Sequence, residues 1–362
     1  MLTSMSVLLW PGQNKQQELA GTIMVLPIKN DVQGRDHEWV TYGMMTQLIN
    51  SLEPTDHIAV ADLNYTLSSL KLAHVDKAPV QNKISRLFDV SGAVIVINSE
   101  LSGSIEDYRL SYNLHFKNDI KRGVLFGRTI TGLVHEMAEL IATLTHQNIK
   151  HSIDDSHNDF NNELMARAIE YIKTEQYDFA EEMLSSLLKL QPSNIMAQRL
   201  SAESQLLQGK FANAEQSLIK AIHLANTGPN AELARLYFFH ALTIFNQQIM
   251  NQPSESDLDR IVRQASHFAQ LENDWLYKAY ISELKSAIAL KQKKLPEAIH
   301  SAIQAKDHFE VIRCPIGKSR TLLTLADLYE QNGDNELSLE HKNLAHKLIS
   351  QNKLEFLYQE AL

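Results

Sequence analysis

The chain has 362 residues, of which 44% are hydrophobic and 21% are charged, so it is long enough for two domains with ordinary apolar cores. Its formal net charge of −9 argues against a general nucleic-acid binder, because neutralising phosphates requires clustered Lys and Arg side chains. The single cysteine, Cys314, excludes a disulfide within the chain, and no run approaches the roughly 20 apolar residues of a membrane-spanning helix.

The first half of the chain alternates between short apolar runs and amphipathic stretches. Residues 22–28 form a continuous apolar run with β-branched members, which predicts a buried strand. Residues 38–52 carry apolar side chains at helical spacing, and residues 108–116 alternate as a half-buried strand does. The other predicted elements are strands at 58–60, 92–97 and 124–130 and helices at 63–72, 80–88 and 133–144. This order predicts an α/β module with a mixed sheet over 22–145, behind an N-terminal extension over 1–21.

The second half contains a sequence that repeats with a period of 34 residues. Ala180 aligns with Ala214, and the aromatic residues Tyr177 and Phe211 precede them at equivalent positions. Small residues let two antiparallel helices approach closely, and the aromatic residue fills the gap between successive pairs. The same spacing relates Ala168 to Ala202, Leu184 to Leu218 and Leu187 to Ala221. The pattern resembles the tetratricopeptide family, whose helix pairs stack into a superhelix with a concave inner face.

Further helix pairs are expected after these two repeats, at 231–248 with 256–271, 275–291 with 296–309 and 318–331 with 335–350. The predicted fold of residues 161–362 is therefore an all-α tetratricopeptide-like superhelix of about five helix pairs. A polar stretch over 146–160 marks the linker between the two halves.

Three segments of the first half resemble one known α/β module. Residues 23–28 read IMVLPI, residues 42–52 read YGMMTQLINSL, and residues 88–103 read FDVSGAVIVINSELSG, followed by the alternating hairpin. Their order is similar to the amino-terminal domain of TolB. That domain precedes tetratricopeptide repeats in CadC-like and ToxR-like one-component transcriptional regulators and in some adenylate cyclases.

The resemblance implies that this chain corresponds to the sensory region of a CadC-like regulator. In such a regulator a winged-helix DNA-binding domain and a membrane helix would lie upstream. The chain would be periplasmic if it is part of such a membrane-anchored regulator, and cytoplasmic if it is not. The disulfide of some relatives cannot form in a chain with one cysteine.

Two patterns that suggest catalysis each lack an essential member. The run Gly317-Lys318-Ser319 ends like a phosphate-binding loop, but Ile312 stands where that motif needs a glycine. His135 begins a pattern like a zinc-protease helix, but Glu139 stands where the second histidine belongs. Both patterns favour ordinary helix and loop positions, and no catalytic residue is predicted.

The linker holds His151 and His157 among three aspartates, a composition that suits a divalent ion or a pH-responsive hinge. Solvated linkers commonly share this composition, so no metal site and no cofactor is predicted. The aromatic residues at 237–239, 275, 277 and 280 have helical spacing, which is more typical of a core than of a binding groove.

We therefore expect a non-enzymatic sensor and scaffold that binds a protein partner or a small ligand and relays binding by domain rearrangement. The junction of the two halves or the concave face would form the site. Predicted contact residues on the inner surface of the first repeats are Lys173, Asn194, Gln198 and Gln205.

Two alternatives stay open at this point. The chain could be a freestanding tetratricopeptide adaptor for protein–protein interaction, or the non-catalytic region of a nucleotide cyclase. A homodimer and an upstream membrane anchor are also left open. Direct contact with nucleic acid is not expected.

Overall fold

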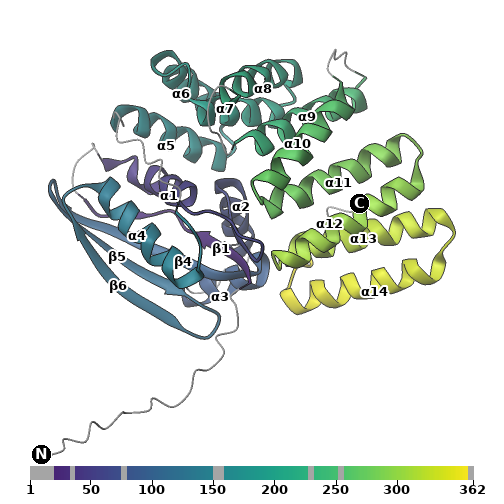
Figure 1. Cartoon of the computed structure of the whole chain (residues 1–362), viewed down its shortest axis with the longest axis horizontal. Helices are drawn as coiled ribbons and strands as arrows, with labels where there is room; N and C mark the ends of the chain where they lie inside the picture. The colour runs from purple at the N-terminus through teal and green to yellow at the C-terminus, as the bar shows by residue number, and fades with distance from the viewer. Residues whose placement is uncertain are drawn as a thin grey trace, which may run out of the picture.

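A mixed β-sheet with its helices precedes an array of antiparallel helices that curves around it (Figure 1). The computed structural model describes residues 20–32, 37–74, 80–149, 159–226, 232–251 and 257–357. The expected extension up to residue 19 and most of the expected linker, with His151 and His157, lie outside these stretches. The architecture is the predicted one, an α/β module followed by an all-α tetratricopeptide-like superhelix.

The sheet is mixed because its first strands are joined by helices and its last three by tight turns. Within the described residues its strands are β1 (Gly21–Val25), β2 (Lys29–Asn30), β3 (Ile58–Val60), β4 (Ala93–Ser104), β5 (Asp107–His115) and β6 (Ile120–Gly127). Their order is β3-β1-β4-β5-β6, with β2 paired to the far end of β4. The central strand β1 pairs in parallel with both neighbours and is buried throughout, as its continuous apolar run predicts.

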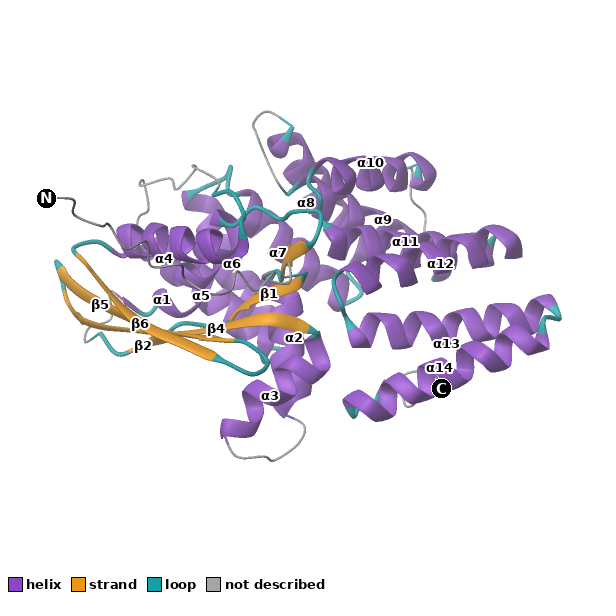
Figure 2. Ribbon diagram, turned by 60° about the horizontal axis from the view of Figure 1, so that its bottom comes forward, coloured by secondary structure: helices purple, strands orange, loops and turns teal. Residues whose placement is uncertain are grey.

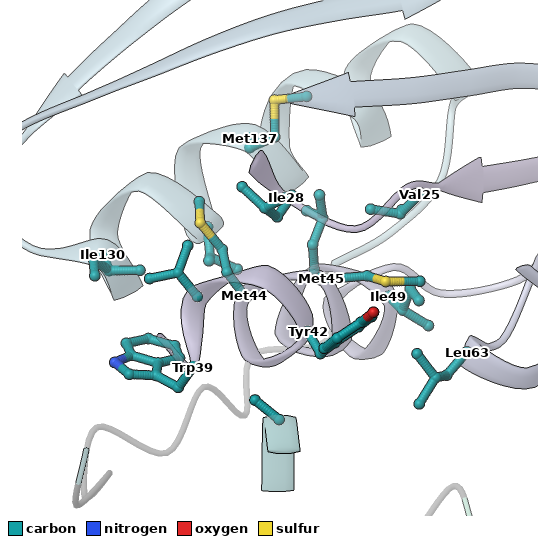
Figure 3. Close-up of a cluster of buried hydrophobic side chains, with 14 of the residues drawn as sticks. Val25, Ile28, Trp39, Tyr42, Met44, Met45, Ile49, Leu63, Ile130 and Met137 are labelled. Carbon is teal, nitrogen blue, oxygen red and sulfur yellow. The ribbon is translucent and has the colours of Figure 1, made fainter. Parts of the chain in front are cut away.

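Four helices cover the two faces of the sheet, namely α1 (Val40–Ser51), α2 (Leu63–His74), α3 (Val80–Ser91) and α4 (Ile130–Thr145). Side chains alternate along β1, so Ile23 and Val25 join the apolar cluster of α1 and α4 while Met24 joins that of α2 and α3. Figure 3 shows Met44 and Met45 projecting from α1 toward β1 and α4. The helices α4 and α3 accordingly lie on opposite faces (Figure 2).

Two predicted strands of the sheet have wrong bounds, and one short strand was not predicted. Strand β4 continues past residue 97 to Ser104, because its second half pairs with β5 in a long antiparallel hairpin. Strand β6 begins earlier and ends at Gly127, because Thr129 caps α4 by accepting a hydrogen bond at Oγ1 from the Gly132 amide at 3.1 Å. Strand β2 was not predicted, since two residues are too short to show a period.

The described part of the second half contains ten helices that pack as antiparallel pairs. They are α5 (Asp159–Lys173), α6 (Tyr177–Leu190), α7 (Ile195–Leu207), α8 (Phe211–Ala225), α9 (Leu233–Ile249), α10 (Leu258–Leu271), α11 (Trp275–Lys291), α12 (Leu295–Val311), α13 (Pro315–Asn332) and α14 (Asn335–Asn352). Ala180 and Ala214 are the fourth residues of α6 and α8, and both are 0% exposed. The predicted equivalence of these two close helix crossings is confirmed.

The α/β module packs against the concave side of the helical array. One apolar cluster joins β1, α1 and α4 to Leu164 of α5, Leu184 of α6 and Leu200 of α7. A second cluster joins α2 and α3 to Leu276 of α11 and Phe309 of α12. The concave face that the repeats predict is thus covered by the chain's own module (Figure 1). Because the cores are shared, the division into units over 22–145 and 161–362 stays a proposal.

A glycine marks a close backbone approach between module and array. Gly92, between α3 and β4, has φ +64°, and a Cβ atom there would lie 1.6 Å from the carbonyl oxygen of Arg313 in the α12–α13 turn. Gly209 has a similar φ of +72° but no atom within 4 Å of the corresponding position. Both glycines therefore have a left-handed backbone conformation, but only Gly92 lies against another part of the chain.

We predict that Gly92→Ala destabilises the protein by about 3 kcal/mol or more, because the Arg313 carbonyl must move. Gly209→Ala should cost only the roughly 1–2 kcal/mol of placing a Cβ atom in a left-handed conformation. Denaturant-unfolding midpoints of the two variants measure the difference. Equal losses would contradict the close contact between module and array.

Candidate functional site

Buried polar side chains gather where the module meets α7, α9 and α11. Asp62, at the start of α2, accepts a hydrogen bond at Oδ1 from the Tyr65 amide at 2.7 Å and so caps the helix. Its other oxygen, Oδ2, accepts a hydrogen bond from the Tyr277 hydroxyl of α11 at 3.1 Å. One carboxylate therefore fixes the beginning of α2 to the array.

Helix α7 contributes an ion pair that faces the module. Arg199 and Glu203 lie one turn apart, so their side chains share a face of α7, and they are only 3% and 6% exposed. The Arg199 guanidinium contacts Glu203 and also approaches Glu232 of α9 within 2.7 Å. Asn64 of α2 donates a hydrogen bond to Glu203 at 2.6 Å. These contacts join α2, α7 and α9.

A second guanidinium joins α9 to α11. Arg235 lies 3.5 Å from Glu232, 3.6 Å from Asp274, and 5.5 Å from the centre of the Tyr277 ring. Asp274 in turn caps α11 by accepting a hydrogen bond from the Tyr277 amide at 3.2 Å. We call this set the junction network; its members are Asp62, Asn64, Arg199, Glu203, Glu232, Arg235, Asp274 and Tyr277.

Carboxylates outnumber guanidinium groups in the junction network, and burial changes the pKa values of several of these groups. Burial raises the pKa of Glu203 and of Asp274 against the opposing effect of the nearby arginines. Burial, followed by the charge of Asp274, also raises the pKa of the adjacent Glu272 to about 8. Burial opposes the charge of Arg199, but Glu203 and Glu232 raise its pKa overall. The contacts of the network with the module are hydrogen bonds, between Asp62 and Tyr277 and between Asn64 and Glu203.

Next to the junction network lies an open pocket of about 650 Å³. Its walls come from the loop before β3, the α10–α11 turn, α11 and the α12–α13 turn, and its lining residues are Ala20, Asp56, His57, Gln270, Asn273, Trp275, Lys278, Glu310, Val311 and Arg313. The Trp275 indole donates a hydrogen bond from Nε1 to the carbonyl oxygen of Thr55 at 3.1 Å. We call this the junction pocket, and both the module and the array form it.

Three of the four predicted contact residues are already engaged within the protein. Lys173 donates a hydrogen bond to the Tyr42 hydroxyl of α1 at 3.2 Å, and Asn194 caps α7 by accepting one from the Ala197 amide at 2.9 Å. Gln205 accepts a hydrogen bond from Ser217 of α8 at 3.1 Å, and Gln198 is half-buried on α7. Their role in binding stays a prediction. The junction network was not predicted from the sequence. The available signal was the spacing of four residues between Arg199 and Glu203, which places their opposite charges on one face of a helix.

The other flagged patterns occupy structural positions. Gly317-Lys318-Ser319 forms the first turn of α13 rather than a loop after a strand. Cys314 is buried, which raises the pKa of its thiol, and it accepts a hydrogen bond from the Tyr65 hydroxyl at 3.1 Å. His135 and Glu139 are an exposed pair on α4, 3.3 Å apart.

Neither metal ligands nor membrane spans stand out in the described part of the chain. No group of three or more His, Cys, Asp or Glu side chains there could hold a metal ion. No helix in those stretches is long and apolar enough to cross a membrane. The aromatic residues of α9 and α11 pack on one another, as Phe238 does on Tyr277 with ring centres 5.4 Å apart.

No family model and no curated protein matches the sequence. Among solved structures, MamA is similar to 51% of this chain over 96% of its own length, with 13% identity and a TM-score of 0.40. Tetratricopeptide-like repeats of a putative kinesin light chain from Podosopora anserina match 54% of this chain over 99% of their length, with 13% identity and a TM-score of 0.42.

YrrB, described as a tetratricopeptide protein with an unusual peptide-binding site, matches 55% of this chain over 91% of its length. Its identity is 14% and its TM-score 0.36. The TolB-like and CadC-like resemblances therefore rest on the sequence motifs alone.

We predict that Arg199→Met lowers the free energy of unfolding by about 3–5 kcal/mol, because Glu203 loses its buried cation. Arg167→Met is the matched control, since Arg167 also joins the array to the module, through Glu38 at 3.0 Å, but its side chain is 50% exposed. That variant should lose less than about 1 kcal/mol. Similar losses in both would show that the buried arginine contributes no more to stability than the exposed one.

Protonation of Glu272 should make stability depend on pH. A carboxyl group whose pKa rises on folding stabilises the folded state while protonated, so its contribution is complete below its ordinary value of 4.5 and is lost as the pH rises through about 8. We expect the free energy of unfolding to fall between about pH 5 and pH 9, and to fall less in Glu272→Gln. Parallel pH profiles for the two proteins would contradict this assignment.

Proposed function

We propose that the chain is a non-catalytic scaffold whose helical array binds a partner protein along one rim. The first helices of successive pairs, α7, α9 and α11, run in the same direction, so their carboxyl ends lie along the same edge of the array. Each of these ends exposes a large apolar side chain. Leu207 is 61% exposed, Met250 63% and Leu290 39%.

This row, which we call the array rim, is the observation that carries the proposal. Single exposed leucines are ordinary, but here large apolar side chains are exposed at the carboxyl ends of three neighbouring helix pairs, and exposed apolar patches mark interaction surfaces. Lys210 and Lys291 lie beside them and would supply a polar border to an apolar contact. The inner face cannot serve in the same way while the α/β module covers it.

The test replaces the rim without touching the core. Immobilised full-length protein would be exposed to an extract of its source organism, and retained proteins identified by mass spectrometry. We expect the combined variant Leu207→Ser, Met250→Ser and Leu290→Ser to lose a partner that the unmodified chain retains. The matched control replaces Leu337, Leu339 and Leu344, three exposed leucines of α14, by serine. Equal retention by the rim variant, or loss in the control as well, would contradict the proposal.

A second candidate function, a ligand-responsive relay, is favoured by the junction pocket. A ligand there would contact both the module and the array and so bind the docked arrangement more tightly than an undocked one. The finer proposal, that this relay is the sensory region of a CadC-like transcriptional regulator, is supported by the sequence resemblance.

Genomic DNA upstream of the Met1 codon tests the regulator proposal. An in-frame winged helix and a span of about 20 apolar residues would support it. A stop codon with a ribosome-binding site directly before Met1 would contradict it, and would leave the rim scaffold intact.

A further inference from the structure

We propose that the junction pocket binds a small oxyanion, a carboxylate or phosphate group on a compact organic body, with Lys278 as the residue that contacts the anionic group. The inference rests on the second candidate function, the ligand-responsive relay, and names the chemistry of its ligand. It is independent of the array rim.

Lys278 is a buried cation on the pocket wall. It belongs to the first turn of α11 and is only 6% exposed. Its ammonium nitrogen lies 3.8 Å from the centre of the Trp275 ring and donates a hydrogen bond to the Asn273 side-chain oxygen at 3.0 Å. An ammonium group has three N–H donors, and among the described residues Asn273 provides its one hydrogen-bond acceptor. A donor is therefore left for a group in the pocket.

The surroundings of Lys278 do not fully compensate its charge. Burial lowers the pKa of the ammonium group, although the carboxylates of Asp274 and Asp56 act in the opposite direction. The net direction shows that desolvation outweighs these two neighbours. An anion that enters the pocket would supply the missing compensation, and a hydrogen bond to a charged oxygen is stronger than one to an amide.

The other charged residues of the pocket carry both signs, and the two carboxylates are already in contact with other side chains. Asp56 accepts a hydrogen bond from Asn273 at 2.8 Å, and Glu310 contacts Lys318, so both carboxylates already have partners. Arg313 and His57 are exposed at the lining of the pocket. Arg313 adds a second cation, and the His57 ring adds a hydrogen-bond donor. The pocket is thus suited to anions although the whole chain has a net charge of −9.

The size and walls of the junction pocket point to a compact ligand. Its volume of about 650 Å³ lies within the range of small-molecule sites. Trp275 and Val311 provide apolar wall beside the polar groups, so an organic body can be buried next to the anionic group. Because Asp56 and His57 come from the module and Lys278 from the array, binding would favour the docked arrangement.

Two probes of opposite charge test whether the junction pocket prefers anions. The full chain would be titrated with benzoate and with benzylamine, which share a ring and differ in charge, and separately with inorganic phosphate. Saturation-transfer NMR detects binding of the two aromatic probes at millimolar affinity, and broadening of the phosphorus NMR signal detects binding of phosphate. We expect saturable binding of benzoate and none of benzylamine. Binding of phosphate without benzoate would support the site and identify phosphate as the preferred oxyanion.

Variants then tie binding to the pocket. Lys278→Met should weaken anion binding about tenfold or more, as expected for loss of a charge-assisted hydrogen bond. Lys285→Met is the matched control, because Lys285 lies on the same helix, is also partly buried, and does not line the pocket. If Lys278→Met does not fold, Arg313→Gln at an exposed position should still weaken binding several-fold. Failure of both anions to bind, preference for benzylamine, or equal effects of Lys278→Met and Lys285→Met would overturn the proposal.

A parallel readout separates the site from the relay. Hydrogen exchange of amides in α2 and α11 should slow when benzoate or phosphate binds, because the ligand favours docking. Saturable binding without any change in exchange would support the site and contradict the relay.

Discussion

The structure depends on the fit of the α/β module into the concave side of the helical array. Both apolar clusters of the module continue into the array, one through α5 to α7 and the other through α11 to α13. An array of helix pairs contacts mainly its neighbours in sequence, so its curvature is set by many small rotations. A module that contacts both ends of the array fixes that curvature, and it converts a repeat structure into one cooperative body.

Apolar burial supplies most of the driving force for this fit, and the junction network supplies its register. Glu203 reaches its hydrogen-bond partner Asn64 on α2 only in the docked arrangement, whereas Arg199 and Glu232 join α7 to α9 within the array. Leaving a buried polar group without its partner is costly. The junction network also shares a structural element with the junction pocket beside it. The α10–α11 turn that places Asp274 in the network places Asn273 and Trp275 in the junction pocket, so docking and ligand contact share one turn.

The helices and strands could be predicted from local sequence patterns, but the specific contacts between the module and the array could not. The period of 34 residues located Ala180 and Ala214, and the alternation over 108–116 located β5, because both signals lie within short windows of sequence. Asp62 and Tyr277 are separated by 215 residues, and no window contains both. The sequence predicted a junction between the two halves but not that the module covers the inner face, because the repeat pattern describes helices and not what covers them. The same reason explains why Lys173, taken as a ligand contact, lies against Tyr42 of the module.

Docking can be tested directly through ion pairs that already exist in the protein. Lys71 of α2 lies 2.6 Å from Glu175 in the α5–α6 turn, whereas Lys342 and Glu330, 3.0 Å apart, belong to the array alone. A zero-length carbodiimide reagent joins such lysine and glutamate pairs by an amide bond, which mass spectrometry of the digested monomer identifies. The account predicts that the Lys71–Glu175 link forms at a yield comparable to that of Lys342–Glu330. Formation of the second link without the first would contradict the docked arrangement.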